Sequence, residues 1–126
     1  MIFGIGTDLI EIARIGSAHA RHGERFLARL LAPAEREEFA GVSDPVRFLA
    51  KRWAAKEAFA KALGTGIRPP VELAGIAVGH DAAGRPLLHF APAIEALLRE
   101  KGIVRAHLSL SDERASAVAF VLLEAG

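Results

Sequence analysis

The pattern of apolar and polar positions predicts one dominant helix in the middle of the chain. Asp44 is a good N-cap, Pro45 suits the first helical position, and Gly64 suits the position after the C-cap. No helix breaker stands between these ends. We therefore expect a helix over 45–63.

Shorter helices are expected on both sides of the central one. Helical spacing runs roughly over 11–21, with Gly23 as its stop. The segment 24–39 is typical of two short helices split at Pro33, which suits a first helical turn. A further short helix is expected over 92–102, opened by its proline and closed by its glycine.

Five stretches have the pattern of strands. The opening stretch, 2–10, is predicted to be a buried strand, because it is largely apolar and carries glycines at positions 4 and 6. A hairpin is expected over 72–90, where a five-residue connection with glycine joins two apolar stretches. A second hairpin is expected over 104–124, and its first strand places Val104 on an apolar face with three further apolar residues.

The predicted fold class is α+β. Helices and hairpins mix without regular alternation of strand and helix, which argues against a parallel sheet. We expect an antiparallel sheet, built from hairpins and packed on the central helix and the shorter helices. No linker, repeat or low-complexity tract divides the chain, so a single domain over 1–126 is expected.

Composition excludes several classes of function. With 52% hydrophobic residues, the chain can bury a sizeable core and is not disordered. It has no cysteine, which rules out disulfides, thiolate metal sites and a cysteine nucleophile. No run of about 18 apolar residues exists, so no membrane span is expected. The N-terminal residues lack a basic leader, and we expect a cytoplasmic protein.

Charge is concentrated in one segment of a nearly neutral chain. The chain has 16 Lys and Arg against 15 Asp and Glu, for a net charge of +1. Segment 47–68 holds six cations and the single anion Glu57, so it carries +5 and the remainder −4. Such a basic stripe predicts one anionic ligand site rather than general adhesion to polyanions.

The central helix carries an acid and a base one turn apart. Glu57 and Lys61 share a stripe with small residues. Spacing alone favours a solvated i,i+4 salt bridge, worth roughly 0.2–0.5 kcal/mol. Arg52 and Lys56 fit that interpretation less well, because both fall inside the apolar arc. Either their stems snorkel to water, or their charged groups meet a phosphate or a partner chain.

Asp8 is the second candidate carboxylate. It follows an apolar, glycine-containing strand, where an acid does nothing for packing. A turn or N-cap carboxylate is the structural alternative, and in isolation it is favoured. The functional interpretation needs a partner acid, and Glu57 is the only one in the basic segment. Two carboxylates with open positions suit Mg²⁺, which commonly also takes water and substrate phosphate oxygens.

Other candidates carry weaker signals. The loop 64–68 frees backbone N–H groups for an oxyanion, but it stands at the wrong end of the helix dipole and is more typical of a helix stop. His107 either lines a site or faces water. No HxxxH, HExxH, GxSxG, GxGxxG or P-loop spacing is present, which argues against a zinc site, a serine hydrolase and a nucleotide fold of those types.

Three blocks of sequence together resemble one enzyme family, the bacterial holo-acyl-carrier-protein synthases. In order they are GIGTDLIEIARI, FLAKRWAAKEAFAKALGTGIR and HLSLSDERASAVAFVLLE. The resemblance covers essentially the whole chain. It implies an α+β fold and Mg²⁺-dependent transfer of 4′-phosphopantetheine from coenzyme A to a serine of apo-acyl carrier protein, in support of fatty acid biosynthesis, with release of adenosine 3′,5′-bisphosphate.

The resemblance also implies roles for individual residues. Asp8 and Glu57 would hold Mg²⁺, and Lys61 would lie next to the diphosphate. The nucleotide would be surrounded by Arg52, Gly64, Thr65, Gly66 and His107. A homotrimer is implied, with each active site between two subunits. The carrier protein would dock on the helix after Asp8, where the arginines are Arg14, Arg21 and Arg25.

One position departs from the family pattern. Some members have a histidine, considered as a base, where this chain has Asp112. Its absence argues against a mechanism that needs that histidine, and leaves a water on the metal or Glu57 to take the serine proton.

Two rival functions come from other classes. A nucleic-acid-binding module could use the basic stripe, although the chain has seven Phe, one Trp, no Tyr and no recognised motif. A non-catalytic trimeric scaffold would use Arg52 and Lys56 only for salt bridges between chains.

Overall fold

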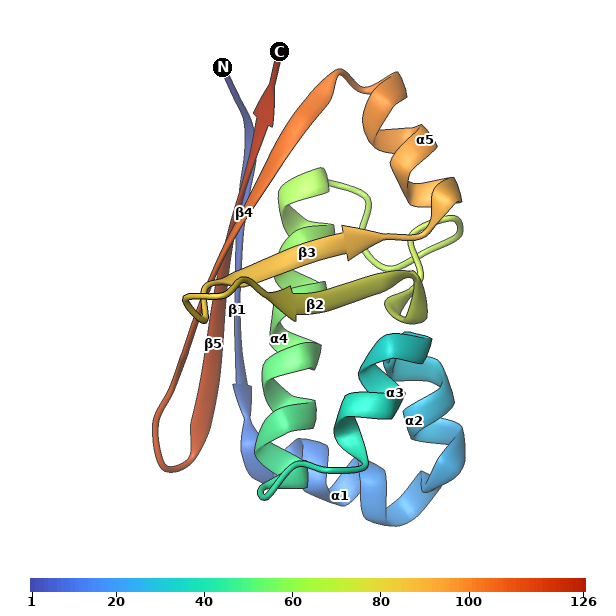
Figure 1. The fold of residues 1–126 in the computed structure, drawn as a ribbon, viewed down its shortest axis with the longest axis vertical. Coiled ribbons are helices and arrows are strands. Elements are labelled where there is room, and N and C mark those ends of the chain that lie inside the picture. Colours follow the sequence, from blue (N-terminus) through green and yellow to red (C-terminus); the bar gives the residue numbers. More distant parts are fainter.

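The chain forms five α-helices and five β-strands arranged around one central helix (Figure 1). The computed structural model describes all 126 residues. In chain order the elements are β1 (Ile2–Glu11), α1 (Ile12–His22), α2 (Glu24–Leu30), α3 (Pro33–Phe39), α4 (Pro45–Leu63), a 3-10 turn η1 (Leu73–Gly75), β2 (Ile76–His80), β3 (Pro86–Phe90), α5 (Pro92–Glu100), β4 (Ile103–Asp112) and β5 (Ser116–Ala125).

Helix α4 has the bounds that its capping residues predict. The Asp44 side chain accepts a hydrogen bond from the backbone N–H of Arg47 at 3.2 Å, and Pro45 occupies the first turn. At the other end, Gly64 adopts the left-handed conformation, with φ of 88°. Most side chains of α4 are buried, and the apolar core of the protein forms around it.

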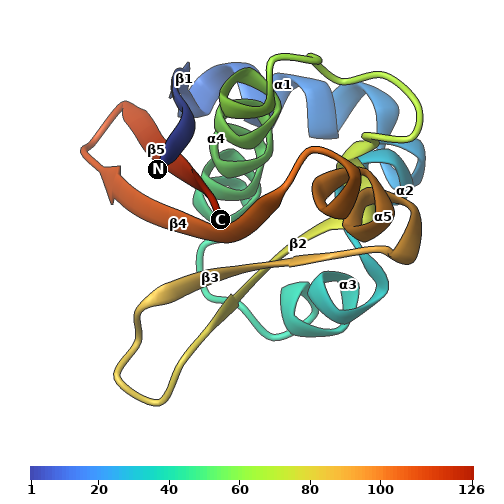
Figure 2. The ribbon, with the colours of Figure 1, turned by 90° about the horizontal axis from the view of Figure 1, so that it is seen from above.

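The α+β class is confirmed, but the hairpins form two separate sheets rather than one. Strand β1 joins the C-terminal hairpin in an antiparallel sheet of order β1-β5-β4, whereas β2 and β3 pair only with each other. The three-stranded sheet packs against α4, and all the helices lie on that side of it (Figure 1). Viewed from above, β2 and β3 run beside β4 at the edge of that sheet, and β2 also contacts α4 (Figure 2).

The prediction of a buried strand over 2–10 is wrong for one of its two faces. Gly6 and Ile10 are buried toward α4, but Ile5 and Leu9 on the other face are 58% and 70% exposed. The physical reason is that helices cover only one side of this sheet, so alternate residues of β1 face away from the core.

The apolar face predicted for the strand over 104–111 is confirmed except at its first residue. Ala106, Leu108 and Leu110 are partly buried against the core, whereas Val104 is 58% exposed. The register of β4 against β5 shifts between Ile103 and Arg105, and this irregularity interrupts the alternation. Among the helices, none is both long and apolar enough to cross a membrane.

Candidate active site

Two glycines bring strand β1 into close contact with the backbone of α4. A Cβ atom on Gly4 would lie 2.1 Å from the carbonyl oxygen of Ala62, and one on Gly6 would lie 2.1 Å from that of Ala58. No side chain fits in either place. Asp8 follows two residues later on the same face of β1, so its side chain also points toward α4.

Lys61 forms an ion pair with Asp8, which comes from a distant part of the sequence. Its Nζ donates to Asp8 Oδ1 at 3.1 Å and to the backbone oxygen of Thr7 at 3.0 Å. The Lys61 side chain is 54% exposed, whereas that of Asp8 is only 15% exposed. Asp8 Oδ2 is buried and has no hydrogen-bond partner. One oxygen of this carboxylate is therefore neutralised and the other is left unsatisfied.

Glu57 lies close enough to Asp8 for the two charges to interact. Burial raises the pKa of Glu57, the negative charge of Asp8 raises it further, and the positive charges of Lys61 and Arg29 oppose both effects. No ion pair joins Glu57 to Lys61, so the predicted i,i+4 salt bridge is wrong. Lys61 turns to β1 instead, because that strand packs beside it on α4 and offers the Asp8 carboxylate and the Thr7 carbonyl.

The Asp8 and Glu57 carboxylates suit a small divalent cation. They offer hard oxygen donors, and the buried, unpartnered Oδ2 of Asp8 is a polar atom that such a cation would satisfy. No three His, Asp or Glu side chains form a complete metal-binding cluster. A cation held here would therefore take its other ligands from water or from a bound substrate, as Mg²⁺ commonly does.

The loop after α4 ends the helix and does not present its glycine N–H groups to a ligand. The N–H of Gly64 donates to the carbonyl oxygens of Ala60 and Lys61, and that of Gly66 donates to Ala60 at 3.4 Å. The Thr65 hydroxyl donates to the Gly66 carbonyl at 2.8 Å. The helix stop that the sequence favours for this loop is confirmed, because the orphan carbonyls of the last helical turn take the glycine N–H groups. The contact of Gly64, Thr65 and Gly66 with the nucleotide stays a prediction.

Comparison with known proteins assigns this chain to an enzyme family. A model of the 4′-phosphopantetheinyl transferase superfamily matches residues 4–121. The chain belongs to that superfamily. It is 55% identical over 124 residues to a holo-[acyl-carrier-protein] synthase of Laribacter hongkongensis, which covers 98% of this chain and 99% of that protein. The chain is thus an enzyme, a phosphopantetheinyl transferase of the holo-acyl-carrier-protein synthase kind.

Solved structures of the same family share the fold. The crystal structure of the synthase from Neisseria meningitidis superposes with a TM-score of 0.96 at 49% identity, covering 98% of this chain and 99% of that one. The synthase from Bacillus anthracis, in complex with CoA (3′,5′-ADP), superposes with a TM-score of 0.84 at 37% identity, covering 100% and 99%.

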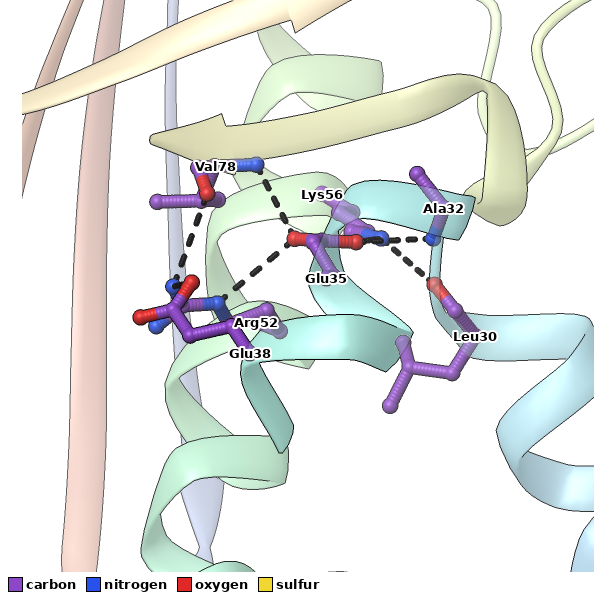
Figure 3. A network of polar contacts seen from close by, with 7 residues as sticks. All are labelled: Leu30, Ala32, Glu35, Glu38, Arg52, Lys56 and Val78. Carbon is purple, nitrogen blue, oxygen red and sulfur yellow. Dashed lines mark hydrogen bonds and ion pairs between the residues drawn. The ribbon is translucent and has the colours of Figure 1, made fainter. Parts of the chain in front are cut away.

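Arg52 is buried and paired with carboxylates of its own chain. Its side chain is 3% exposed, with the guanidinium 3.1 Å from Glu38 and 3.5 Å from Glu35 (Figure 3). The guanidinium also lies over the ring of Phe48. The contact of Arg52 with the nucleotide, which the family resemblance implies, stays a prediction. Lys56 meets Glu35 rather than a phosphate or a partner chain.

The predicted basic stripe is not a basic surface of the enzyme. Five of its six cations are paired with carboxylates from within the chain. Arg47 meets Asp44 and Asp112, Lys51 meets Asp112, Arg52 meets Glu35 and Glu38, Lys56 meets Glu35, and Lys61 meets Asp8. The net charge of segment 47–68 is therefore balanced by residues outside it, and the observation behind the nucleic-acid interpretation disappears.

His107 lies on the opposite face of the sheet from Asp8. It pairs with Leu122 across the β4–β5 ladder, whereas Asp8 pairs with Ala119 on the face toward α4. Its Nε2 is 2.5 Å from Glu124, and this hydrogen bond lowers the pKa of the Glu124 carboxyl. Within one chain the structure does not bring His107 to the carboxylates of the transferase.

Asp112, at the position where some family members have histidine, is engaged elsewhere. Its Oδ2 accepts from Arg47 at 2.8 Å, and Lys51 lies 3.8 Å from its other oxygen. It thus ties the end of β4 to the first turns of α4. The carboxylate is held by these cations in a structural role.

The remaining predicted residues form an arginine-rich surface on the first two helices. Arg14, Arg21 and Arg25 are exposed and make no ion pair. Arg29 is a site residue that the sequence does not reveal, since nothing in its spacing links α2 to α4. Its charge reaches Glu57. The exposed arginines thus extend from α1 along α2 toward the carboxylates.

Proposed function

We propose that this enzyme transfers 4′-phosphopantetheine from coenzyme A to a serine of apo-acyl carrier protein. The serine oxygen attacks the phosphorus that bears pantetheine, the bond to the bridging diphosphate oxygen breaks, and adenosine 3′,5′-bisphosphate leaves with that oxygen. The observation that carries this proposal is the meeting of Asp8, Glu57 and Lys61, supported by relatives named for the same activity.

Asp8 and Glu57 are proposed to hold Mg²⁺. Two adjacent carboxylates, one with an unsatisfied buried oxygen, support this assignment. When bound, the ion neutralises charge on diphosphate oxygens. Lys61 is the cation next to this position and, being 54% exposed, can turn from Asp8 to the substrate. Its ammonium is proposed to stabilise the charge that develops on the departing bisphosphate.

The carrier protein is proposed to dock on α1 and α2. Arg14, Arg21 and Arg25 are exposed, lack partners within the chain and bind carboxylates well, which suits an acidic protein surface. The same helices bear Arg29, so a carrier bound there would hold its serine near Glu57. We further propose that the enzyme works in the cytoplasm and serves fatty acid biosynthesis.

A homotrimer with active sites between subunits is proposed as the working assembly. Its support is the outer face of the sheet, which no other element of the chain covers (Figure 2). Four large apolar residues on this face are exposed: Phe3, Ile5, Leu9 and Phe120. Arg52 and Lys56 give no support, because both are paired inside the chain. His107 lies on the outer face too and can join a site only across subunits. Light scattering should give the mass of three chains, and a monomer at active concentrations would refute the assembly.

A transfer assay tests the central proposal. Purified enzyme is incubated with apo-acyl carrier protein, coenzyme A and Mg²⁺, and the carrier is weighed by mass spectrometry. A mass increase of one phosphopantetheine group on the serine is expected, together with adenosine 3′,5′-bisphosphate in equal amount. An unmodified carrier, with the enzyme folded and Mg²⁺ present, would contradict the proposal.

A further inference from the structure

A buried carboxylate, Glu35, ties three separate elements to helix α4 (Figure 3). Its Oε1 accepts from Lys56 Nζ at 2.6 Å and from the N–H of Ala32 at 2.9 Å, and its Oε2 accepts from the N–H of Val78 at 2.9 Å. Lys56 Nζ also donates to the carbonyl oxygen of Leu30 at 2.5 Å. The end of α2, the start of α3 and the middle of β2 are thus joined to α4 through one ion pair.

Stability alone does not account for this pair. The Lys56 and Glu35 side chains are 0% and 1% exposed, and burial lowers the pKa of Lys56 to about 8 even though Glu35 opposes the shift. Burying two charges costs desolvation free energy that their attraction barely repays, and apolar replacements of such pairs are often neutral or stabilising. Because this buried ion pair adds little to the stability of the fold, we look for its role in the relative positions of the elements that it joins.

The pair stands one residue away from two groups of the candidate active site. Lys56 precedes Glu57 on α4, and the Leu30 carbonyl that Lys56 binds follows Arg29, whose charge reaches Glu57. Successive residues on a helix are about 100° apart. Holding Lys56 toward Glu35 therefore sets the rotation at which α4 presents Glu57, and the bond to Leu30 sets where α2 presents Arg29.

We propose that the Glu35–Lys56 ion pair is a positioning device that holds Glu57 and Arg29 in register with each other and with Asp8. This inference rests on the proposed role of Glu57 in the transferase. Phosphoryl-type transfer depends on positioning and charge neutralisation rather than on a covalent intermediate, so a small displacement of these groups lowers the rate. Lys56 and Glu35 are positioning residues: they do not contact the substrate, and they act through Glu57 and Arg29.

The test compares two nearly isosteric variants with a core control. Lys56→Met removes the charge at similar volume, and Glu35→Gln keeps the shape and one acceptor. If Lys56→Met does not fold, the milder Glu35→Gln decides. The control is Ile94→Ala, a fully buried residue of α5, which packs on β3 and β4 and loses stability through a cavity. All proteins are assayed at a temperature where circular dichroism shows each to be folded.

Two readouts separate positioning from stability. We expect Lys56→Met and Glu35→Gln to lower kcat by about 10–100-fold and to weaken Mn²⁺ binding, read from the electron paramagnetic resonance of free Mn²⁺, by a similar factor. The KM for coenzyme A should change less than kcat. Ile94→Ala should keep the kcat of the wild type.

Wild-type kcat and Mn²⁺ affinity in a folded Glu35→Gln or Lys56→Met variant would overturn the positioning role. The positioning role would also be overturned if Ile94→Ala lost as much kcat as the ion-pair variants at the same loss of thermal stability. If the wild type itself binds no Mn²⁺, the metal site under Proposed function fails instead, and the comparison of kcat values still decides whether the ion pair positions the site.

Discussion

Lys61 Nζ lies 3.1 Å from Asp8 Oδ1, although the two residues are 53 positions apart in the sequence. The contact exists because β1 lies against α4 at Gly4 and Gly6, where no side chain fits. It leaves Asp8 with one paired oxygen and one unpaired buried oxygen, beside Glu57. This arrangement, rather than a salt bridge within the helix, defines the candidate site.

Lys61→Ala should lower kcat by about 10²-fold, because a preorganised cation next to the leaving group would be lost. The affinity for coenzyme A should fall too. Steady-state kinetics with both substrates measures these effects. Lys101→Ala, at an exposed lysine without an ion pair, is the control and should behave as wild type. A Lys61→Ala enzyme with altered thermal stability but unchanged kcat would show that Lys61 only pairs with Asp8.

Gly6→Ala should destabilise the fold by about 1–3 kcal/mol or more, since its Cβ would meet the Ala58 carbonyl oxygen at 2.1 Å. Activity should fall further than stability, because the strand that carries Asp8 must move away from α4. Denaturant unfolding and the transfer assay measure the two losses. Gly41→Ala is the matched control, since a Cβ there meets nothing closer than 4.0 Å. Equal tolerance of both substitutions would contradict the close packing.

Glu57→Gln should raise the stability of the metal-free enzyme at neutral pH while abolishing most transfer. The pKa of Glu57 is raised above its ordinary 4.5, so the folded state holds the proton more tightly than the unfolded state does. Stability therefore falls as pH rises through 4.5 toward the folded pKa, and the loss persists above it. Glutamine cannot ionise and avoids this loss.

Thermal unfolding in EDTA across acidic to neutral pH measures the effect. The wild type and Glu57→Gln should converge at low pH and separate as pH rises, whereas Glu100→Gln, at an exposed carboxyl, should follow the wild type. A Glu57→Gln protein that is less stable than wild type at neutral pH without metal would mean that the charged carboxylate is favourable in the fold.

Charge reversal on α1, with Arg14→Glu and Arg21→Glu combined, should raise KM for the carrier protein and flatten its dependence on salt. Exposed charges at the rim of an interface mainly set the encounter rate and its screening. The KM for coenzyme A should stay unchanged. Equal weakening toward both substrates would instead assign these arginines to the fold or to the nucleotide pocket.

The bounds of the helices and hairpins follow from the sequence because their signals are local. Asp44, Pro45 and Gly64 act within a turn of the helix ends that they define, and the connection over 81–85 joins β2 to β3 as its glycine predicts. Asp8, Glu57 and Lys61 could be named as candidates from the sequence, but local spacing favoured structural roles for them, and their predicted roles in the site came from the family resemblance.

What local patterns could not determine is where charges and apolar faces meet. Arg52 and Lys56 interrupt an apolar arc, which left snorkelling, a phosphate or a partner chain as explanations. The actual partner of Lys56, Glu35, lies 21 residues away, and no local pattern marks it. The alternation of residues along β1 does not predict which face of the strand the helices cover. In the structure they cover the face of Gly6 and Ile10, and Ile5 and Leu9 are exposed.

The sequence by itself determined the elements and the fold class, since these depend on caps, turns and periodicity within short windows. Only the tertiary structure decided that Lys61 pairs with Asp8, that Glu35 neutralises Lys56, and that the basic segment is balanced from outside it. The reason is physical. Burial and Coulomb interactions depend on distance in space, and chain folding brings together groups that no local window contains.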